Sequence, residues 1–361
     1  MGGGGSGIWC VALILQAPDA PRSDRYATGQ GCPQSRYGSG TERPQARGYA
    51  TMFLGIEIGG TKLQLGLGAG DGVLAGLWRG TVDVAAGPEG IRRQITLAVP
   101  ELLARSEIER SRLRTVGIGF GGPVDDATHT IIKSHQIEGW DNFPLADWIA
   151  EVVGLPAVLG NDADVAGLAE ALYGAGKGLS PIFYITIGSG IGGGLIINGE
   201  IYRGCGRGAA EIGHLRTWYV KHHFTGSWSE VVAPLEERAS GWALARWWKH
   251  PKLPADHSAE DLAELARQGD QEALRILGSA WDTLADGICH VIALLCPRRI
   301  VIGGGVSLMG EPLLFEPLRK RVAERVFKPF AGLTEIVPAA LGEEVVVHGA
   351  LALARRYSCP V

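Results

Sequence analysis

The sequence predicts a two-domain protein of mixed α and β structure with a cleft between its domains. Its 361 residues are more than one hydrophobic core usually organises, since domains typically span about 50 to 250 residues. Strand-like apolar runs that end in glycines alternate with helix-length segments. A strand, glycine turn and strand occur over residues 53–67 and again over residues 182–194, which indicates two similar halves.

In the first half, the strand pair of residues 53–67 is followed by an expected third strand over Gly72–Trp78. A helix is expected over Pro88–Arg105. The run Val116–Phe120 has the composition of a buried strand and ends in another glycine turn. A short strand near Ala157–Leu159 comes next.

The second half is expected to follow a helix over Asp164–Tyr173. Its first strand, Ile182–Ile187, runs directly into a glycine-rich turn. The outer helices and a last strand that closes on glycines are expected at Glu236–Trp248, Ala259–Arg267, Gln271–Leu295 and Arg299–Gly305.

The domain boundaries follow from this order. Residues 1–51 are expected to be a disordered extension or a misassigned start before Met52, because Gly, Ser, Pro, Gln and Arg dominate them without apolar periodicity. The N-terminal α/β domain is expected over 52–165 and the C-terminal α/β domain over 166–344. The helical segment 345–358 is expected to pack back on the first domain.

Composition excludes several classes of protein. The net charge is −4 and the basic residues are scattered, so no stripe suits a nucleic-acid backbone. Six cysteines without a CxxC pair are typical of reduced thiols in a cytoplasmic protein. The apolar run Ile8–Leu15 is too short to span a bilayer and no basic residue precedes it, so no membrane partner is expected.

The segment Glu57–Lys62 is the most specific candidate for chemistry in the first half. Glycines directly after a strand let backbone N–H groups approach an anion, because no Cβ blocks the path. This segment adds a carboxylate, a hydroxyl and a cation to two glycines, a combination that suits Mg²⁺ and phosphate together. Three such turns in one chain indicate a nucleotide polyphosphate.

Asn161 and Asp162 lie between a predicted strand and a predicted helix, where a carboxylate would project into the cleft. A kinase that phosphorylates an alcohol needs one carboxylate to accept the hydroxyl proton. Alone, the pair would more often cap the helix. Its position between two glycine turns favours Asp162 as a general base.

Glu211 and His214 stand three residues apart and suit a vicinal diol, since the carboxylate accepts hydrogen bonds and the imidazole donates or accepts them. Taken alone, a Glu and a His at this spacing are more often polar residues on the surface. A sugar is therefore one of two interpretations at this point.

Together these motifs resemble the ROK family, named for its repressors, open reading frames and kinases. The resemblance runs from about Met52 to Arg355 and implies the sugar-kinase and actin-like ATPase fold, which is ribonuclease H-like, with an interdomain cleft. It implies ATP and Mg²⁺ as cofactors. The residues that resemble the family's two phosphate motifs and its adenosine motif are Glu57, Gly59, Gly60, Thr61, Lys62, Thr186, Gly188, Ser189, Gly190, Gly192, Gly303, Gly304 and Gly305.

The same likeness implies a sugar site with Asp162 as the catalytic base. The residues it implies for binding the hexose are Gly122, Asn161, Glu211, His214 and Glu236.

The chain departs from the family pattern at four places. Glu57 replaces the usual Asp, Gly121 a usual Pro, and Gln136 a usual sugar-contacting Asn. Residues 215–234 contain no cysteine, whereas many members carry a zinc knot there, so no structural zinc is expected even with His214, His222 and His223 nearby. Trp218, Phe224 and Trp228 are expected to fill that space instead.

These observations predict an ATP-dependent, glucokinase-like hexose kinase. Two alternatives stay open: a polyphosphate-dependent glucokinase, for which Lys133, Lys177, Arg203 and Arg207 would have to line a basic track, and a sugar-sensing regulator. The regulator is disfavoured because residues 1–50 show no helix-turn-helix pattern. The expected partners are a small hexose and a nucleotide, and a homodimer is left open.

Overall fold

The computed structural model describes residues 51–358, apart from 135–136, 223–227, 247–251 and 255. Apart from Thr51, the N-terminal extension predicted from composition lies outside the described residues. Tyr49–Val361 form one compact unit. The predicted boundary between the two domains stays a prediction, and below we call the parts built on the two large sheets the first and second lobes.

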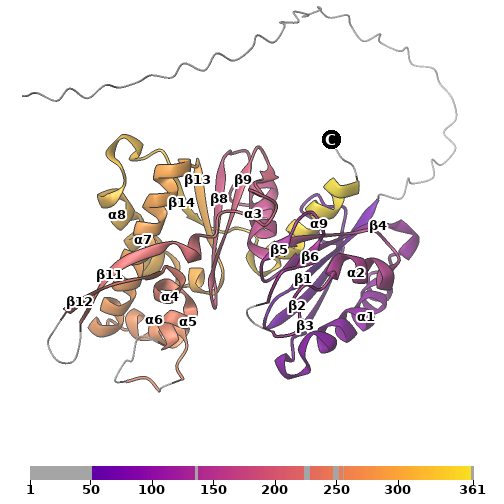
Figure 1. Cartoon of the computed structure of the whole chain (residues 1–361), viewed down its shortest axis with the longest axis horizontal. Coiled ribbons are helices and arrows are strands. Elements are labelled where there is room, and N and C mark those ends of the chain that lie inside the picture. Colours follow the sequence, from indigo (N-terminus) through magenta and orange to yellow (C-terminus); the bar gives the residue numbers. More distant parts are fainter. Residues whose placement is uncertain (1–50, 135–136, 223–227, 247–251, 255, 359–361) are drawn as a thin grey trace, which may run out of the picture. The chain divides into compact units, whose positions relative to one another are not determined.

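The first lobe is built on a five-stranded sheet in the order β3-β2-β1-β4-β7 (Figure 1). β1 pairs antiparallel with β2 and parallel with β4, and β4 pairs parallel with β7. Every residue of β1 is buried, as expected of a central strand covered on both faces. The strands are β1 Met52–Ile58, β2 Lys62–Gly68, β3 Gly76–Thr81, β4 Leu113–Phe120 and β7 Ala157–Asn161.

The second lobe repeats this topology in a sheet of order β10-β9-β8-β13-β14. Again one hairpin, β8–β9, is followed by two parallel neighbours. The internal duplication indicated by the sequence is therefore present in the strand order. The strands are β8 Ile182–Ile187, β9 Ile191–Ile197, β10 Glu200–Ile201, β13 Arg299–Gly303 and β14 Glu335–Pro338.

Helices and short ribbons complete the described structure. The α-helices are α1 Gly87–Arg105, α2 Leu145–Val153, α3 Asp162–Tyr173, α4 Glu236–Ala239, α5 Gly241–Arg246, α6 Ala259–Arg267, α7 Gln271–Leu295, α8 Glu316–Arg325 and α9 Val345–Ser358. The small ribbons pair β5 Val124–Asp125 with β6 Thr130–Ile131, and β11 Arg216–His222 with β12 Trp228–Pro234. Short helical turns are η1 Val84–Ala86, η2 Arg110–Arg112, η3 Ile212–His214, η4 Gly305–Met309, η5 Glu311–Phe315 (a π-helix), η6 Lys328–Phe330 and η7 Gly342–Glu344.

Several element boundaries differ from those expected. β3 begins at Gly76, because Gly70 and Gly72 take positive φ angles of 64° and 91° and turn the chain first. The helix expected over Glu236–Trp248 is broken at Ser240, whose extended backbone (ψ 164°) ends α4. The Ser240 hydroxyl then accepts the Ala243 N–H at 3.1 Å and starts α5.

Figure 1 shows α3 and α9 between the two sheets, with α9 beside the first sheet although it follows the second in sequence. Glycines allow this close approach. A Cβ added to Gly117 of β4 would lie 1.9 Å from the Ala350 carbonyl oxygen of α9. A Cβ added to Gly349 of α9 would lie 1.9 Å from the Val165 carbonyl oxygen of α3. The two helices therefore cross with their backbones in contact.

We expect Gly349→Ala to lower the free energy of unfolding by about 1–3 kcal/mol, because the added methyl group must push α3 and α9 apart. Urea denaturation measures this. Gly278→Ala in α7 is the matched control, since its methyl would meet only the end of the Arg321 side chain at 3.1 Å. That control should be neutral or slightly stabilising, as alanine is favoured over glycine within helices. Equal stability of the two variants would contradict the close crossing.

Candidate active site

Some of the predicted site residues of each lobe line one cavity of about 480 Å³. It lies where β4 and β7 end and where β8 turns into β9, the edge at which ligands commonly bind in α/β folds. Its lining residues are Gly121, Gly122, Pro123, Asn161, Asp162, Thr186, Gly188, Ser189, Gly190, Ile191, Gly192, Arg207, Glu211, His214, Glu236 and Trp242.

Asp162 is the first residue of α3 and lies in this cavity. Burial raises the pKa of its carboxyl to about 6, the Ala163 N–H opposes this rise, and the charge of Glu211 adds to it. Its Oδ1 accepts the Ala163 N–H at 2.8 Å. At neutral pH this carboxyl is mostly ionised yet basic enough to take a proton.

Asn161 caps α3, as its sequence position alone suggested. Its Oδ1 accepts the N–H groups of Ala163 at 2.9 Å and Asp164 at 3.2 Å. Its Nδ2 donates to the Gly122 carbonyl oxygen at 3.1 Å. The Asn161 side chain therefore positions Asp162 and the Gly122 loop, and its amide keeps one N–H for a substrate.

The Glu57–Lys62 motif lies beside this cavity and does not line it. Glu57 is 5% exposed, and burial raises the pKa of its carboxyl to about 7 against the opposing charge of Lys62. The Lys62 Nζ lies 3.2 Å from Glu57 Oε1 and donates to the Glu343 carbonyl oxygen at 3.0 Å. Glu57 Oε2 is buried without a hydrogen-bond partner. Gly121 joins the two regions, because it lines the cavity and its N–H donates to the Ile58 carbonyl oxygen at 2.9 Å.

Residues of the other two glycine motifs meet at the end of β8. A Cβ at Gly304, where φ is 84°, would lie 2.6 Å from the Ile187 carbonyl oxygen, so only glycine fits there. Gly188 and Gly305 instead face open space. Of the adenosine-like residues, Gly303, Gly304 and Gly305 stay outside the cavity lining.

Glu211, His214 and Glu236 all line the cavity, as the sugar-site prediction requires. Glu211 and His214 lie at either end of the turn η3. Glu236 Oε2 also accepts the Ile191 N–H at 2.7 Å, 45 positions away in sequence. Glu236 therefore holds the glycine turn between β8 and β9 as well as facing the cavity.

Trp242 lines the cavity although no sequence pattern indicated it, and Arg207 lines it although the sequence named Arg207 only as a candidate for a basic track. Trp242 was placed inside a continuous helix, and it reaches the cavity because the chain breaks at Ser240. Arg207 lies 3.7 Å from Asp125, in a loop without a recognisable motif. The sequence contains little indication that these two side chains reach the cavity, since the position of each depends on a local backbone turn.

The aromatic packing expected in place of the zinc knot is wrong at Trp218, which is 55% exposed on β11. Gln136, His223 and Phe224 lie outside the described residues. Within the described part of the chain, no three His, Cys, Asp or Glu side chains group as a metal site would require. Nor does that part contain a helix long and apolar enough to cross a membrane.

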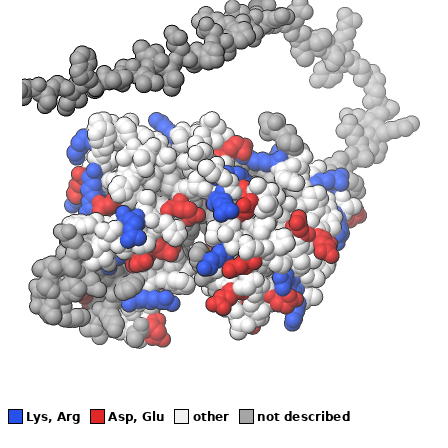
Figure 2. Space-filling view, viewed as in Figure 1, with Lys and Arg blue, Asp and Glu red and all other residues white. Residues whose placement is uncertain are grey.

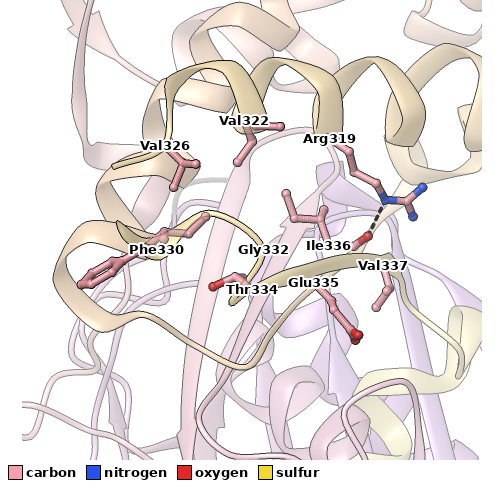
Figure 3. Close-up of a pocket in the computed structure, with 11 residues that line it drawn as sticks. Arg319, Val322, Val326, Phe330, Gly332, Thr334, Glu335, Ile336 and Val337 are labelled. Carbon is pink, nitrogen blue, oxygen red and sulfur yellow. Dashed lines mark hydrogen bonds between the residues drawn. The ribbon is translucent and has the colours of Figure 1, made fainter. Parts of the chain in front are cut away.

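A second cavity of about 490 Å³ lies in the second lobe among α7, α8 and β14 (Figure 3). Its walls are mostly aliphatic, with Val322 and Ile336 among them. Arg319 Nε already donates to the Ile336 carbonyl oxygen at 2.7 Å, as the dashed line shows. Thr334 Oγ1 donates to the Pro297 carbonyl oxygen at 2.7 Å. None of the predicted site residues lines this cavity, so the first cavity is the candidate active site.

The chain has two α/β lobes of the same strand order. One cavity holds a carboxylate, a glycine turn and a polar pair. This arrangement is that of the sugar-kinase and actin-like ATPase class. The ROK family model matches residues 53–357. The chain therefore belongs to the ROK family, and it is a sugar kinase.

Three relatives support this assignment. The chain is similar to a glucokinase of Thermotoga maritima, with 32% identity over 83% of this chain and 96% of that protein. It is similar to the structure of a ROK family glucokinase from Streptomyces griseus in complex with glucose and AMPPNP, with 31% identity, a TM-score of 0.71, and coverage of 84% and 99%. An inorganic polyphosphate/ATP-glucomannokinase from Arthrobacter shares 28% identity, with a TM-score of 0.56 and coverage of 83% and 97%.

We expect Glu236→Ala to loosen the glycine turn, because the Ile191 N–H loses its acceptor. A hydrogen bond to a charged group contributes about 1.5–3 kcal/mol, so amide exchange over residues 188–192 should become about 10- to 100-fold faster. Mass-spectrometric hydrogen exchange measures this. Glu237→Ala on the same short helix is the control, since Glu237 is exposed. Equal exchange in both variants would show that Glu236 does not hold the turn.

Proposed function

We propose that this ROK protein transfers the terminal phosphoryl group of ATP to a hydroxyl of a hexose, with glucose the leading acceptor and Asp162 the general base. The observation that carries the proposal is the shared cavity. It brings Asp162, the polar pair Glu211 and His214, and the glycine turn of residues 188–192 together. The T. maritima and S. griseus relatives, both called glucokinases, support glucose as the acceptor.

In this mechanism a hexose hydroxyl oxygen forms a bond to the terminal phosphorus while the bond from that phosphorus to the ADP oxygen breaks. The hydroxyl proton moves to Asp162. Glu211, His214 and Glu236 bind the other hydroxyls and hold the reacting oxygen in line with the phosphoryl group. The backbone of the Gly188–Gly192 turn and the Lys62 ammonium group face the phosphates and stabilise their charge.

The residues present also fit Mg²⁺. Kinases hold Mg²⁺ through one or two carboxylates, water and substrate phosphates, so a closed protein cage is not required. Glu57 supplies a carboxylate whose Oε2 is buried and unpartnered. Mg²⁺, when bound, would neutralise phosphate charge, and Glu57 would hold it while Lys62 limits the negative charge at that point.

The choice of ATP over polyphosphate rests on the basic residues that a long polyanion would need. The Arg203 side chain is paired with Asp126 of the first lobe. Lys177 follows the C-terminal end of α3, whereas Asp162 begins that helix. The face drawn in Figure 2 mixes acidic and basic side chains without a track of one sign. Neither Arg203 nor Lys177 therefore supports a continuous basic path to Asp162.

Polyphosphate stays the second candidate donor because of two observations. Arg207 is exposed and lines the cavity. A relative of similar fold is an inorganic polyphosphate/ATP-glucomannokinase.

We expect Asp162→Asn to lower kcat by about 10²- to 10⁴-fold while the Kd for glucose changes little, because the amide keeps its shape but cannot take the proton. The amide oxygen can still accept the Ala163 N–H, and Asn161, which caps α3, is unchanged. Rapid-quench kinetics and calorimetry measure the two quantities. A variant with wild-type kcat would remove Asp162 from the base role.

The pH dependence of kcat/KM is a second test of Asp162 as the general base. The base works ionised, and the pKa of Asp162 is about 6, so wild-type kcat/KM should fall tenfold per pH unit below about pH 6. Asp162→Asn is the comparison, since its residual kcat/KM should lose the fall near pH 6 because the amide does not titrate.

We expect ATP to support glucose phosphorylation with a kcat/KM at least tenfold above that of polyphosphate. The reason is that Arg203 and Lys177 do not extend a basic path to Asp162. A coupled assay of ATP, GTP and polyphosphate against glucose, mannose, fructose and N-acetyl hexosamines measures donor and acceptor together. Polyphosphate as the better donor would overturn the choice of ATP.

A further inference from the structure

We propose that Trp242 is the stacking surface for the base of the donor nucleotide. This inference rests on the proposed nucleotide-dependent function and adds a residue that determines donor specificity.

Trp242 is held between the two glycine turns of the second lobe. The Gly241 N–H donates to the Gly188 carbonyl oxygen at 2.8 Å, and the Trp242 N–H donates to the Ser189 carbonyl oxygen at 3.3 Å. A Cβ added to Gly241 would lie 2.7 Å from the Gly188 oxygen and 3.6 Å from Val306, which follows Gly305. The backbone that carries the indole is thus fixed against both turns.

The indole of Trp242 is half-exposed at the cavity, unlike the tryptophans of the two cores. Trp242 is 49% exposed and lines the cavity, whereas Trp140 and Trp281 are at most 1% exposed. An aromatic ring left partly in water can still bury apolar area against a ligand. Arg246 places its guanidinium carbon 4.9 Å from the ring centroid, which holds the ring by a cation–π contact.

The position of Trp242 along the glycine turn favours the base over the sugar. A Cβ at Gly192 would lie 3.1 Å from Ala163, the residue after Asp162. Gly188, which precedes the tip of the same turn, instead contacts Gly241 beside Trp242. Phosphates bound at the turn would therefore have the transferring end near Asp162 and the nucleoside end near Trp242.

The side chains near Asp162 and those near Trp242 suit the two ends of a nucleotide bound in this direction. Glu211 and His214 supply polar partners for hydroxyl groups. Trp242 supplies a flat apolar face, and every nucleobase has a matching π-face. The ligand class is a nucleoside polyphosphate whose base stacks on the indole.

The experiment compares ADP with pyrophosphate, which carries phosphates and no base, by titration calorimetry with Mg²⁺ on the full chain. Base stacking on an aromatic residue is worth about 1–3 kcal/mol, so Trp242→Ala should weaken ADP binding by about 5- to 100-fold. Pyrophosphate affinity and the Kd for glucose should stay within about twofold, since neither ligand reaches the indole. Trp242→Phe should recover part of the ADP affinity.

Trp218→Ala is the matched control, because Trp218 is 55% exposed on β11 and outside the cavity lining. It should leave ADP binding unchanged. An equal loss of ADP and pyrophosphate affinity in Trp242→Ala would show that the turn itself moved, and overturns the inference. A selective loss of glucose affinity would assign the ring to the acceptor and overturns it as well.

The inference and the proposed function fail in distinguishable ways. If wild-type protein phosphorylates glucose with ATP but Trp242→Ala binds ADP normally, only the inference fails. If wild-type protein uses polyphosphate and binds ADP no more tightly than pyrophosphate, the proposed donor fails, and the stacking role of Trp242 falls with it.

Discussion

The carboxylate of Glu170 joins the two places where the chain crosses between the sheets. Glu170 lies within α3, the first crossing, and is fully buried. Its Oε2 accepts the Ala175 N–H at 2.7 Å, and its Oε1 accepts the N–H groups of Ala340 and Leu341, each at 2.9 Å. Ala340 and Leu341 belong to the second crossing, between β14 and α9. A carboxylate removed from water is tolerable only with such partners, so both crossings are fixed together.

The part of the first lobe proposed to bind phosphate is connected to this junction. The chain that Glu170 holds continues into η7, where the Glu343 carbonyl oxygen accepts the Lys62 ammonium group at 3.0 Å. The following helix, α9, then packs on the backbones of β4 and α3 through Gly117 and Gly349. The helix that begins with Asp162 and the segment that orients Lys62 are therefore parts of one connected structure. A change at the junction is therefore expected to reach both the proposed base and the proposed phosphate contacts.

The sequence predicted those parts of the molecule that have local signals. Buried strands such as Ile182–Ile187 and helices such as Gln271–Leu295 have the periodicity and length of their type, and their bounds agree with the structure. The glycine turns and the Asp162 position were visible because each follows a strand directly. The duplication could be recognised because both halves repeat a strand, turn and strand order.

What the sequence did not predict depends on contacts between distant residues or on single backbone turns. The bond from Glu236 to Ile191 spans 45 positions, and that from Glu170 to Ala340 spans 170. Neither has a local pattern, and a Glu inside a helix would ordinarily be assigned to the surface. The break at Ser240 was missed although Gly241 follows it, because helix formers lie on both sides of this Ser-Gly pair. That break is what brings Trp242 to the cavity.

Several carboxyl groups are buried at or near the candidate site, and their burial lowers the free energy of unfolding at neutral pH. Burial is the first cause that raises the pKa values of Glu57, Asp162 and Asp164, to about 7, 6 and 8. The folded state then holds these protons more firmly than the unfolded chain, so the stability these groups contribute is lost as pH rises from about 4 to 8. Asp164, with Arg203 opposing the rise, remains largely protonated at neutral pH and adds little negative charge beside Asp162. With a pKa of about 6, Asp162 is ionised at neutral pH and still basic enough for the proton transfer proposed for it, a compromise that better solvation of the site would remove.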